Sequence, residues 1–340
     1  MRRGRSTATC LALAVLALSG RVLFADPLRY EFSEPHMGTL VRIVVYASDP
    51  GSAARAASAA FARVASLDAA FSDYRDDSEL MALCRRAGEG PVPVSLDTFE
   101  LLTRAAEISH RAGGAFDVTV GPAVQLWRRA RRTRSLPDPE RIAAARALVG
   151  HEHVRLDEAS RTVRLAKSGM RLDLGGIAKG YAAQEATRVL TEAGIARSLV
   201  AAGGDIVVTA PPPGARGWTV AVAPVEAASG VAPLSLRDAA VSTSGGAEQF
   251  AEIGGVRYAH IVDPRTARAI EGSRQVTVVA RDGATADGLA TATVVLGEEG
   301  LAVVDATPGA AAILFIESPG GVRRLESRNW AALTSTGAVP

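Results

Sequence analysis

Apolar and polar residues repeat with two different periods along the chain, which predicts a mixture of strands and helices. Apolar and β-branched residues alternate with other residues over 37–47, as is typical of a strand. Over 51–74 the apolar residues instead follow the spacing of an amphipathic helix. No internal repeat is found.

The same criteria predict further elements up to residue 318. Helices are predicted over 95–114, 137–150, 178–194 and 286–297. Strands are predicted within 198–210, 218–225, 236–245, 258–264, 275–280 and 310–318, with a hairpin over 153–167 and a surface loop over 210–217. A strand-like run is predicted to end at Trp127, and the basic run 128–134 to be a solvated loop. Strands come in antiparallel-looking runs with helices at irregular intervals, which favours an α+β fold over a doubly wound sheet.

The first 25 residues have the pattern of a secretory signal peptide. Three of the first five residues are arginines, and an apolar run over 7–20 follows that is too short to span a bilayer comfortably. Ala25 offers a small residue for cleavage, whereas Cys10 lies too early for lipoprotein processing. We therefore expect export, with a retained N-terminal anchor as the alternative. The remaining chain, 26–340, is long enough for one large domain or two small ones.

Composition narrows the possible partners and cross-links. The formal net charge of +2 gives no reason to expect a nucleic-acid partner. Once the signal peptide is removed, Cys84 is the one cysteine left in the sequence, so an intramolecular disulfide is excluded in the processed chain.

Two glycines interrupt the stretch 171–190 between a strand-like start and an Ala-rich helix. Asp173 precedes Gly175 and Gly176, and Lys179 lies in the first turn of the predicted helix. Free N–H groups and the helix dipole favour an anion at such a helix start, so phosphate is the natural ligand. The segment matches neither a Walker A loop nor GxGxxG, so a tight structural turn is the alternative.

A second segment, 282–293, places a carboxylate and a hydroxyl on one helix face. Asp287 and Thr291 are four residues apart and so share a side of the predicted helix. Their hard oxygens suit Mg²⁺, which takes few protein ligands together with waters and substrate phosphates. A capped helix with a chance threonine is the alternative. His260, on a predicted strand before an Asp-Pro turn, is a weaker candidate, because a lone histidine is usually structural.

Together, in this order, the segments resemble the ApbE family, the FAD:protein FMN transferases. The resemblance covers roughly 37–318, and its most specific parts are DLGGIAKGYA and HIVDPRT. The matching segments are MGT at 37–39, FSDYRDDSEL at 71–80, GGAFDVTVGP at 113–122, DLGGIAKGYA at 173–182, AAGGDIVV at 201–208, VSTSGG at 241–246, HIVDPRT at 260–266 and ADGLATA at 286–292.

The resemblance implies an α+β fold of T-fold type and an ApbE-like flavin transferase domain over 26–340. It implies an exported, periplasmic or inner-membrane-associated enzyme that binds FAD and Mg²⁺. Such an enzyme splits the FAD pyrophosphate and moves FMN onto a Ser or Thr hydroxyl of an acceptor protein. The positions that match FAD contacts are Met37, Tyr74, Ala115, Phe116, Asp117, Asp173, Lys179 and Ile261. Asp287 and Thr291 match metal-ligating side chains, Gly176 a backbone oxygen ligand, and His260 a histidine tied to activity.

Two alternative functions stay open, and the first of them uses the same site. An FAD pyrophosphatase would pass the phosphoryl group to water and release FMN and AMP. A flavin-binding protein without catalysis would need no Mg²⁺ site, so the intact Asp287 and Thr291 argue against it. The chain departs from the family at Ala267, where Gly is usual, at Gly288, where Ala is more usual, and in lacking the lipoprotein cysteine.

Overall fold

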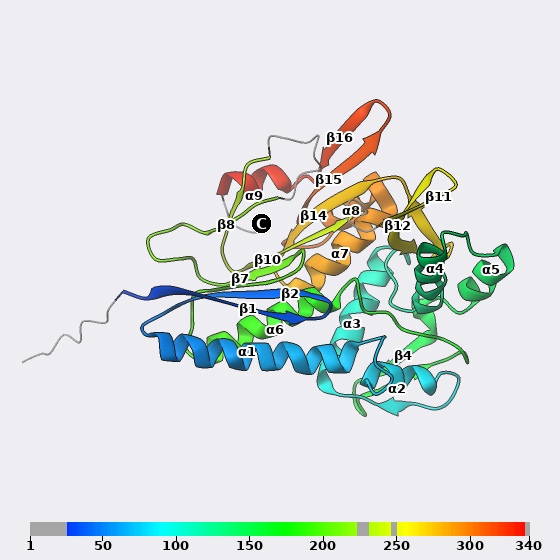
Figure 1. Cartoon of the computed structure of the whole chain (residues 1–340), viewed down its shortest axis with the longest axis horizontal. Helices are drawn as coiled ribbons and strands as arrows, with labels where there is room; N and C mark the ends of the chain where they lie inside the picture. The colour runs from blue at the N-terminus through cyan, green and yellow to red at the C-terminus, as the bar shows by residue number, and fades with distance from the viewer. Residues whose placement is uncertain (1–25, 223–230, 246–249, 337–340) are drawn as a thin grey trace, which may run out of the picture.

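A large antiparallel sheet forms the centre of the computed structural model, which describes residues 26–222, 231–245 and 250–336 (Figure 1). The strand order is β1-β2-β6-β7-β10-β14-β15-β16, and each neighbouring pair is antiparallel. The strands are β1 Leu28–His36, β2 Thr39–Ala47, β6 Ser198–Ala202, β7 Asp205–Val208, β10 Ala239–Gly245, β14 Arg274–Ala280, β15 Ala311–Ser318 and β16 Gly321–Glu326. The sheet with its packed helices confirms the predicted α+β class.

Both faces of the sheet are buried, because successive strand residues point to opposite sides. In β2, Ile43 packs on the helical side and Val44 on the other side. The second side is covered by a short pair of strands and a C-terminal helix: β8 Trp218–Val220, β9 Leu234–Leu236 and α9 Trp330–Thr336. Trp330 is among the largest fully buried side chains there.

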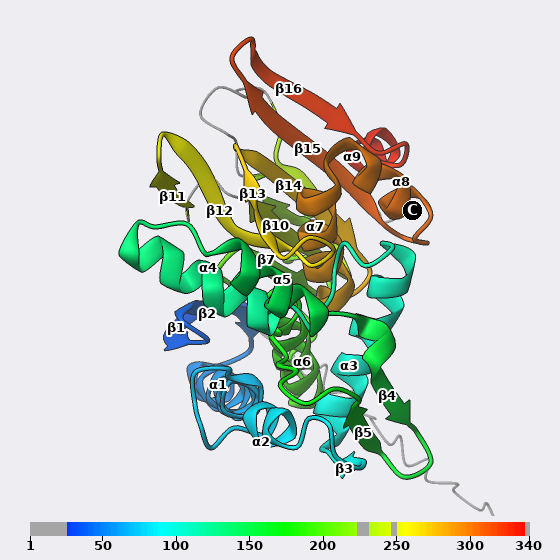
Figure 2. The same ribbon diagram turned by 90° about the vertical axis from the view of Figure 1, so that its right-hand side faces the viewer.

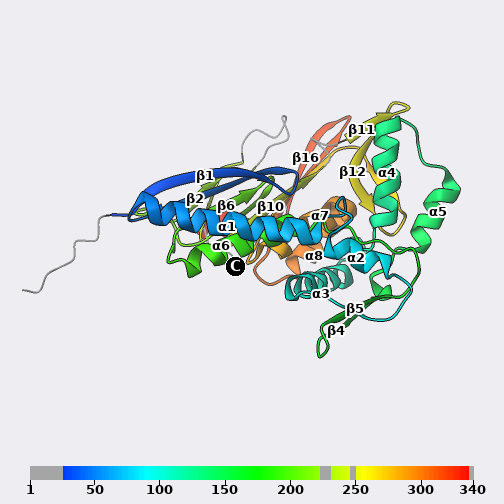
Figure 3. The same cartoon turned by 60° about the horizontal axis from the view of Figure 1, so that its bottom comes forward.

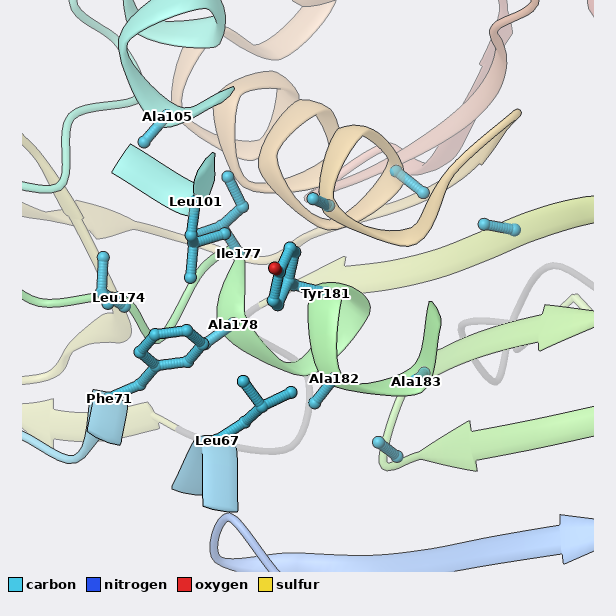
Figure 4. Packing of buried hydrophobic residues seen from close by; sticks show 14 of the residues in the cluster. Leu67, Phe71, Leu101, Ala105, Leu174, Ile177, Ala178, Tyr181, Ala182 and Ala183 are labelled. Atoms are coloured by element: carbon cyan, nitrogen blue, oxygen red, sulfur yellow. The ribbon is translucent and has the colours of Figure 1, made fainter. Parts of the chain in front are cut away.

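Helices α6 (Ala178–Glu192) and α7 (Gly283–Leu296) pack on the first side of the sheet. Nearly every residue of α7 is buried, because α6, the sheet and α3 (Leu96–Arg111) surround it. The long helix α1 (Pro50–Phe71) lies alongside α6 (Figure 3). Figure 4 shows Leu67 and Phe71 of α1 beside Tyr181 of α6 in this core.

A second group of elements lies beside the main sheet (Figure 2). Some of these elements contribute residues to the lining of a pocket. The sheet β11-β12-β13 packs against α4 and α5 around Trp127 and Tyr258. Its elements are β11 Phe250–Ile253, β12 Val256–Asp263, β13 Arg268–Glu271, α4 Gly121–Thr133 and α5 Pro139–Ala147. The remaining elements are α2 Glu79–Arg85, β3 Val92–Pro93, η1 His151–His153, β4 Val154–Asp157, β5 Thr162–Leu165, η2 Gly297–Glu299 and α8 Gly300–Asp305.

Every helix predicted from periodicity is present, with ends shifted by a few residues. Two predictions on α4 are wrong: the run ending at Trp127 is helical from Gly121, and the basic run 128–134 continues that helix to Thr133. Two elements that were not predicted, β16 and α9, follow β15. The predicted signal peptide, residues 223–225 of a predicted strand and Gly246 of the VSTSGG segment lie outside the described residues. Within the described part of the chain, no helix is both long and apolar enough to cross a bilayer.

Candidate active site

A pocket of about 1110 Å³ opens between the main sheet, the starts of α6 and α7, and the β11-β12-β13 sheet. Ligand pockets for drug-sized molecules typically occupy roughly 300–1,000 Å³, so this volume accommodates a dinucleotide. All the residues predicted to bind FAD or metal line it, with one exception, and so does His260. The predicted residues in the lining are Tyr74, Ala115, Phe116, Asp117, Asp173, Gly176, Lys179, His260, Ile261, Asp287 and Thr291.

Met37 is the exception. Instead of belonging to a strand, it forms with Gly38 the two-residue turn between β1 and β2, with φ of 52° and 71°. Two positive φ values are typical of a type I′ hairpin turn. The Met37 N–H donates to Asp68 on α1 at 2.8 Å, and its side chain packs against the core. The structure therefore places Met37 outside the residues that line the pocket.

The Asp-Leu-Gly-Gly turn that precedes α6 brings this helix close to Thr291 of α7. The Asp173 carboxylate accepts from the Gly175 N–H at 2.8 Å, which closes the turn. Thr291 Oγ1 lies 3.5 Å from the Gly176 carbonyl oxygen. A Cβ at Gly176 would lie 2.9 Å from Thr291 Oγ1, so a side chain here would fill the space between the two oxygens. Glycine thus keeps a backbone oxygen and a hydroxyl together at the pocket.

Asp287 is almost completely buried, and it holds the first turn of α6. Its Oδ2 accepts from the Gly180 N–H at 3.2 Å and lies 3.5 Å from Lys179 Nζ. Burial, together with the nearby Asp205 carboxylate, raises the pKa of Asp287 to about 7, although Lys179 opposes the shift. Burial alone would lower the pKa of Lys179, but the Asp205 and Asp287 carboxylates outweigh it and raise that pKa.

Helices α6 and α7 approach at a glycine–glycine contact. A Cβ at Gly180 would lie 2.1 Å from the Gly283 carbonyl oxygen, and a Cβ at Gly283 would lie 2.0 Å from the Gly180 oxygen. Gly283 N–H donates to Gln184 on α6 at 3.0 Å. Because neither position has room for a side chain, the contact places Asp287 within reach of the α6 N-terminus.

At the mouth of the pocket, α4 is tied to the glycine turn through Arg128. Its guanidinium donates to Asp173 at 2.9 Å and also bonds to Asp73. The same group stacks over the Tyr74 ring, 4.5 Å from the centroid, while the Tyr74 ring remains largely exposed. Burial and the neighbouring Asp73 raise the pKa of Asp173, and Arg128 counteracts this. Tyr74 thereby offers an aromatic surface to a ligand in the pocket.

The Asp117 side chain is occupied by bonds within the protein. Its Oδ1 accepts from the Thr119 N–H and Oγ1 at 2.8 and 2.7 Å, and its Oδ2 accepts from the His151 N–H at 2.6 Å. Burial raises the pKa of Asp117, and the hydrogen bonds from Thr119 oppose that shift. The carboxylate therefore holds the loop 115–120 in place at the pocket wall.

His260 lies on β12, which carries it into the pocket wall beside Ile261. The turn after β12 has a left-handed backbone at Ala267, with φ of 56°, a conformation that favours the glycine expected there from the resemblance. The Ala267 carbonyl accepts from Trp127 Nε1 at 2.9 Å, which fixes this turn on α4. The other departure, Gly288, lets α7 approach α3, since a Cβ there would lie 2.6 Å from Ile108 Cδ1.

Five charged residues of the pocket were missed by the sequence predictions: Arg128, Arg131, Asp205, Arg257 and Glu317. Arg128 and Arg131 lie in the run that was predicted to be a loop. Asp205 lies in the AAGGDIVV segment, directly after the pair Gly203–Gly204. That pattern of glycines beside a carboxylate was the available signal, because small residues let other groups approach the backbone.

A family model described as the ApbE family matches residues 37–315. The chain belongs to the ApbE family. An FAD:protein FMN transferase from Treponema pallidum is 35% identical over 326 residues, which cover 90% of this chain and 89% of that protein. The ApbE flavin transferase of Vibrio cholerae superposes with a TM-score of 0.81 at 30% identity, covering 90% of this chain and 99% of the other. The ApbE protein of Thermotoga maritima superposes with a TM-score of 0.80 at 32% identity, covering 90% of this chain and 99% of the other.

The oxygen atoms that line the pocket of this ApbE family protein are suitable ligands for magnesium. No group of three or more His, Cys, Asp or Glu side chains that could hold a metal occurs among the described residues. The pocket instead gathers oxygens: the Asp287 carboxylate, the Thr291 hydroxyl and the Gly176 carbonyl. Mg²⁺ prefers such hard oxygens, keeps several waters and binds substrate phosphates, so few protein ligands are needed.

Proposed function

We propose that this ApbE family protein is an Mg²⁺-dependent FAD:protein FMN transferase. It cleaves the pyrophosphate of FAD, attaches FMN through a phosphoester to a Ser or Thr of an acceptor protein, and releases AMP. The observation that carries the proposal is the cluster of Asp287, Thr291 and the Gly176 carbonyl in a pocket large enough for FAD. The relatives named FAD:protein FMN transferase support it.

Asp287, Thr291 and the Gly176 carbonyl would hold the magnesium. When bound, Mg²⁺ neutralises the pyrophosphate and stabilises the negative charge that develops on the leaving AMP. Lys179 adds a fixed cation beside these oxygens, and the α6 N-terminus adds its dipole. These groups bind and orient the phosphates, and in phosphoryl transfer such positioning and electrostatics supply most of the rate.

The transfer replaces the phosphoanhydride bond of FAD by a phosphoester bond to the acceptor. The acceptor hydroxyl oxygen forms a bond to the phosphorus of the FMN half, and the bond from that phosphorus to the AMP oxygen breaks. The hydroxyl proton must leave, and His260 in the pocket wall is the group proposed to take it.

His260→Ala tests this assignment. General-base catalysis typically contributes about 10²- to 10⁴-fold, so transfer to the acceptor at saturating FAD will fall within that range. FAD affinity, measured by quenching of flavin fluorescence, will change little, because the pyrophosphate ligands remain. Unchanged transfer in the variant would remove His260 from the mechanism and leave a nearby carboxylate as the base.

The reaction is tested by incubating the purified protein with FAD, Mg²⁺ and a candidate acceptor domain from the same organism. A fluorescent acceptor band in a denaturing gel, with one AMP per labelled acceptor, is the expected result. FMN and AMP released without a labelled band, with every candidate acceptor, would identify a pyrophosphatase. FAD that binds but stays intact would identify a flavin-binding protein.

Binding of Mg²⁺ will depend on pH through Asp287. Because its pKa is raised to about 7, Asp287 carries a proton below that pH, and the cation must displace this proton. The apparent dissociation constant for Mg²⁺ will therefore rise by about tenfold per pH unit below 7 and level off above it. The pKa of Asp287 is higher in the folded than in the unfolded chain. The free energy of unfolding of the cation-free protein therefore falls as the pH rises towards 7. Titration with Mn²⁺ at several pH values measures the effect, and a flat profile would contradict it.

We also propose that the protein acts outside the cytoplasm, after loss of residues 1–25. The support is the basic start, the short apolar run and Ala25 in the sequence. Cell fractionation followed by N-terminal sequencing tests this, and an intact N-terminus in the membrane fraction would show instead that the segment is retained as an anchor.

A further inference from the structure

Asp205 is a buried carboxylate of the pocket that is neither a cation ligand nor a proton acceptor in the proposed mechanism. It is the first residue of β7 and follows the Gly203–Gly204 turn, where Gly203 has a φ of 64°. A Cβ at Gly204 would lie 2.7 Å from the Thr243 carbonyl oxygen, so glycine is needed for β7 to begin here. The turn brings Asp205 into the pocket lining, and the residue is only 2% exposed.

The two carboxylate oxygens of Asp205 have different surroundings. Oδ2 forms an ion pair with Lys179 Nζ at 3.1 Å. Oδ1 is buried and has no hydrogen-bond partner among the residues that the structure describes. A buried acceptor without a partner lowers the stability of the fold by about 1–3 kcal/mol, and by more when the acceptor is charged. Such an oxygen in a pocket wall points to a donor supplied by a ligand.

Charge balance indicates what kind of ligand this is. Lys179 Nζ lies between two buried carboxylates, 3.1 Å from Asp205 and 3.5 Å from Asp287. When both carboxylates are ionised, one ammonium cannot neutralise them, so the group keeps a net negative charge in a poorly solvated place. Buried charge of this kind needs a counter-charge. A divalent cation supplies it, and the waters that Mg²⁺ retains supply hydrogen-bond donors.

We propose that Asp205 is the second carboxylate of the cation site, where its Oδ1 accepts a hydrogen bond from a water bound to the divalent cation that Asp287 and Thr291 hold. The inference rests on the proposed Mg²⁺-dependent function and names a further residue of that site. Asp205 is a positioning residue, because it acts through the hydration shell. Outer-shell partners of this kind typically contribute about 10- to 100-fold to metal affinity.

The test measures cation binding directly, with the full chain and without FAD. Mn²⁺ replaces Mg²⁺, and free Mn²⁺ is followed by electron paramagnetic resonance. Asp205→Asn keeps the shape of the side chain and will weaken Mn²⁺ binding about 10- to 100-fold. Glu252→Gln, which removes an exposed carboxylate from strand β11, is the matched control and will bind as the unaltered protein does.

A double-variant cycle separates this role from an effect through Lys179. If Asp205 only kept the ammonium away from Asp287, Asp205→Asn would have no effect in a Lys179→Gln background. The proposal predicts that the loss persists there. An Asp205→Asn protein that binds Mn²⁺ normally, while Asp287→Asn does not, would overturn the proposal and leave the proposed function standing. Failure of the unaltered protein to bind Mn²⁺, both without FAD and with it, would overturn the proposal and the proposed function together.

Discussion

Asp287→Asn will lower AMP release from FAD by about 10³-fold, because the magnesium loses its carboxylate ligand. A bound cation contributes several kcal/mol of charge stabilisation in such reactions, and each 1.36 kcal/mol is a factor of ten in rate. Asparagine keeps an oxygen that can accept from the Gly180 N–H, so the α6–α7 contact is retained. The rate is measured by chromatography of AMP at saturating FAD and Mg²⁺.

Asp305→Asn is the matched control for this experiment. Asp305 is another largely buried, ion-paired aspartate, 3.0 Å from Arg328, and it does not line the pocket. Loss of this ion pair will mainly lower the free energy of unfolding and will have little effect on the rate of AMP release. If Asp287→Asn released AMP as fast as the unaltered protein, the assignment of the cation to this pocket would be wrong.

Gly180→Ala will destabilise the fold and disable the site together. The added Cβ would lie 2.1 Å from the Gly283 carbonyl oxygen and 2.9 Å from Asp287 Cβ, so the helices α6 and α7 must separate. Overpacking typically costs about 1–3 kcal/mol, and a backbone contact lies at the upper end because no side chain can rotate away. The free energy of unfolding, measured by urea denaturation, will fall by about 3 kcal/mol.

Gly90→Ala provides the comparison. A Cβ at Gly90 meets nothing within 4 Å, so the unfolding midpoint will hardly change. Mn²⁺ binding gives a second readout, since separation of α6 from α7 moves Asp287 away from the Gly176 turn. A Gly180→Ala protein as stable as the unaltered one would show that the two helices are less closely constrained than the geometry indicates.

Periodicity predicted the elements that are buried on a well-defined face, such as α1, α3 and α6. It failed for β1, because that strand lies at the edge of the sheet and most of its residues are exposed. It failed for α4 because β-branched residues before Gly121 continue into a short apolar run, which periodicity alone does not resolve. Pro122, a residue typical of a first helical turn, was the signal for the helix.

The site was predictable where its residues belong to one local segment. The glycine turn with Lys179 and the Asp287–Thr291 pair are local patterns whose chemistry follows from spacing. Their mutual contact is not local, since α6 and α7 are about a hundred residues apart in sequence and meet through Gly180 and Gly283. The hydrogen bonding of Asp117 and Asp205 also depends on the fold. Both oxygens of Asp117 accept hydrogen bonds within the protein, whereas Asp205 keeps a buried oxygen without a partner among the described residues.

The most direct test of flavin transfer is the intact mass of the acceptor protein after incubation with this protein, FAD and Mg²⁺. We expect the acceptor mass to increase by one FMN less one water, with an equal amount of AMP released, and Asp287→Asn to slow both changes by about 10³-fold. An acceptor that keeps its original mass while FMN and AMP accumulate would contradict transfer and show that water is the acceptor.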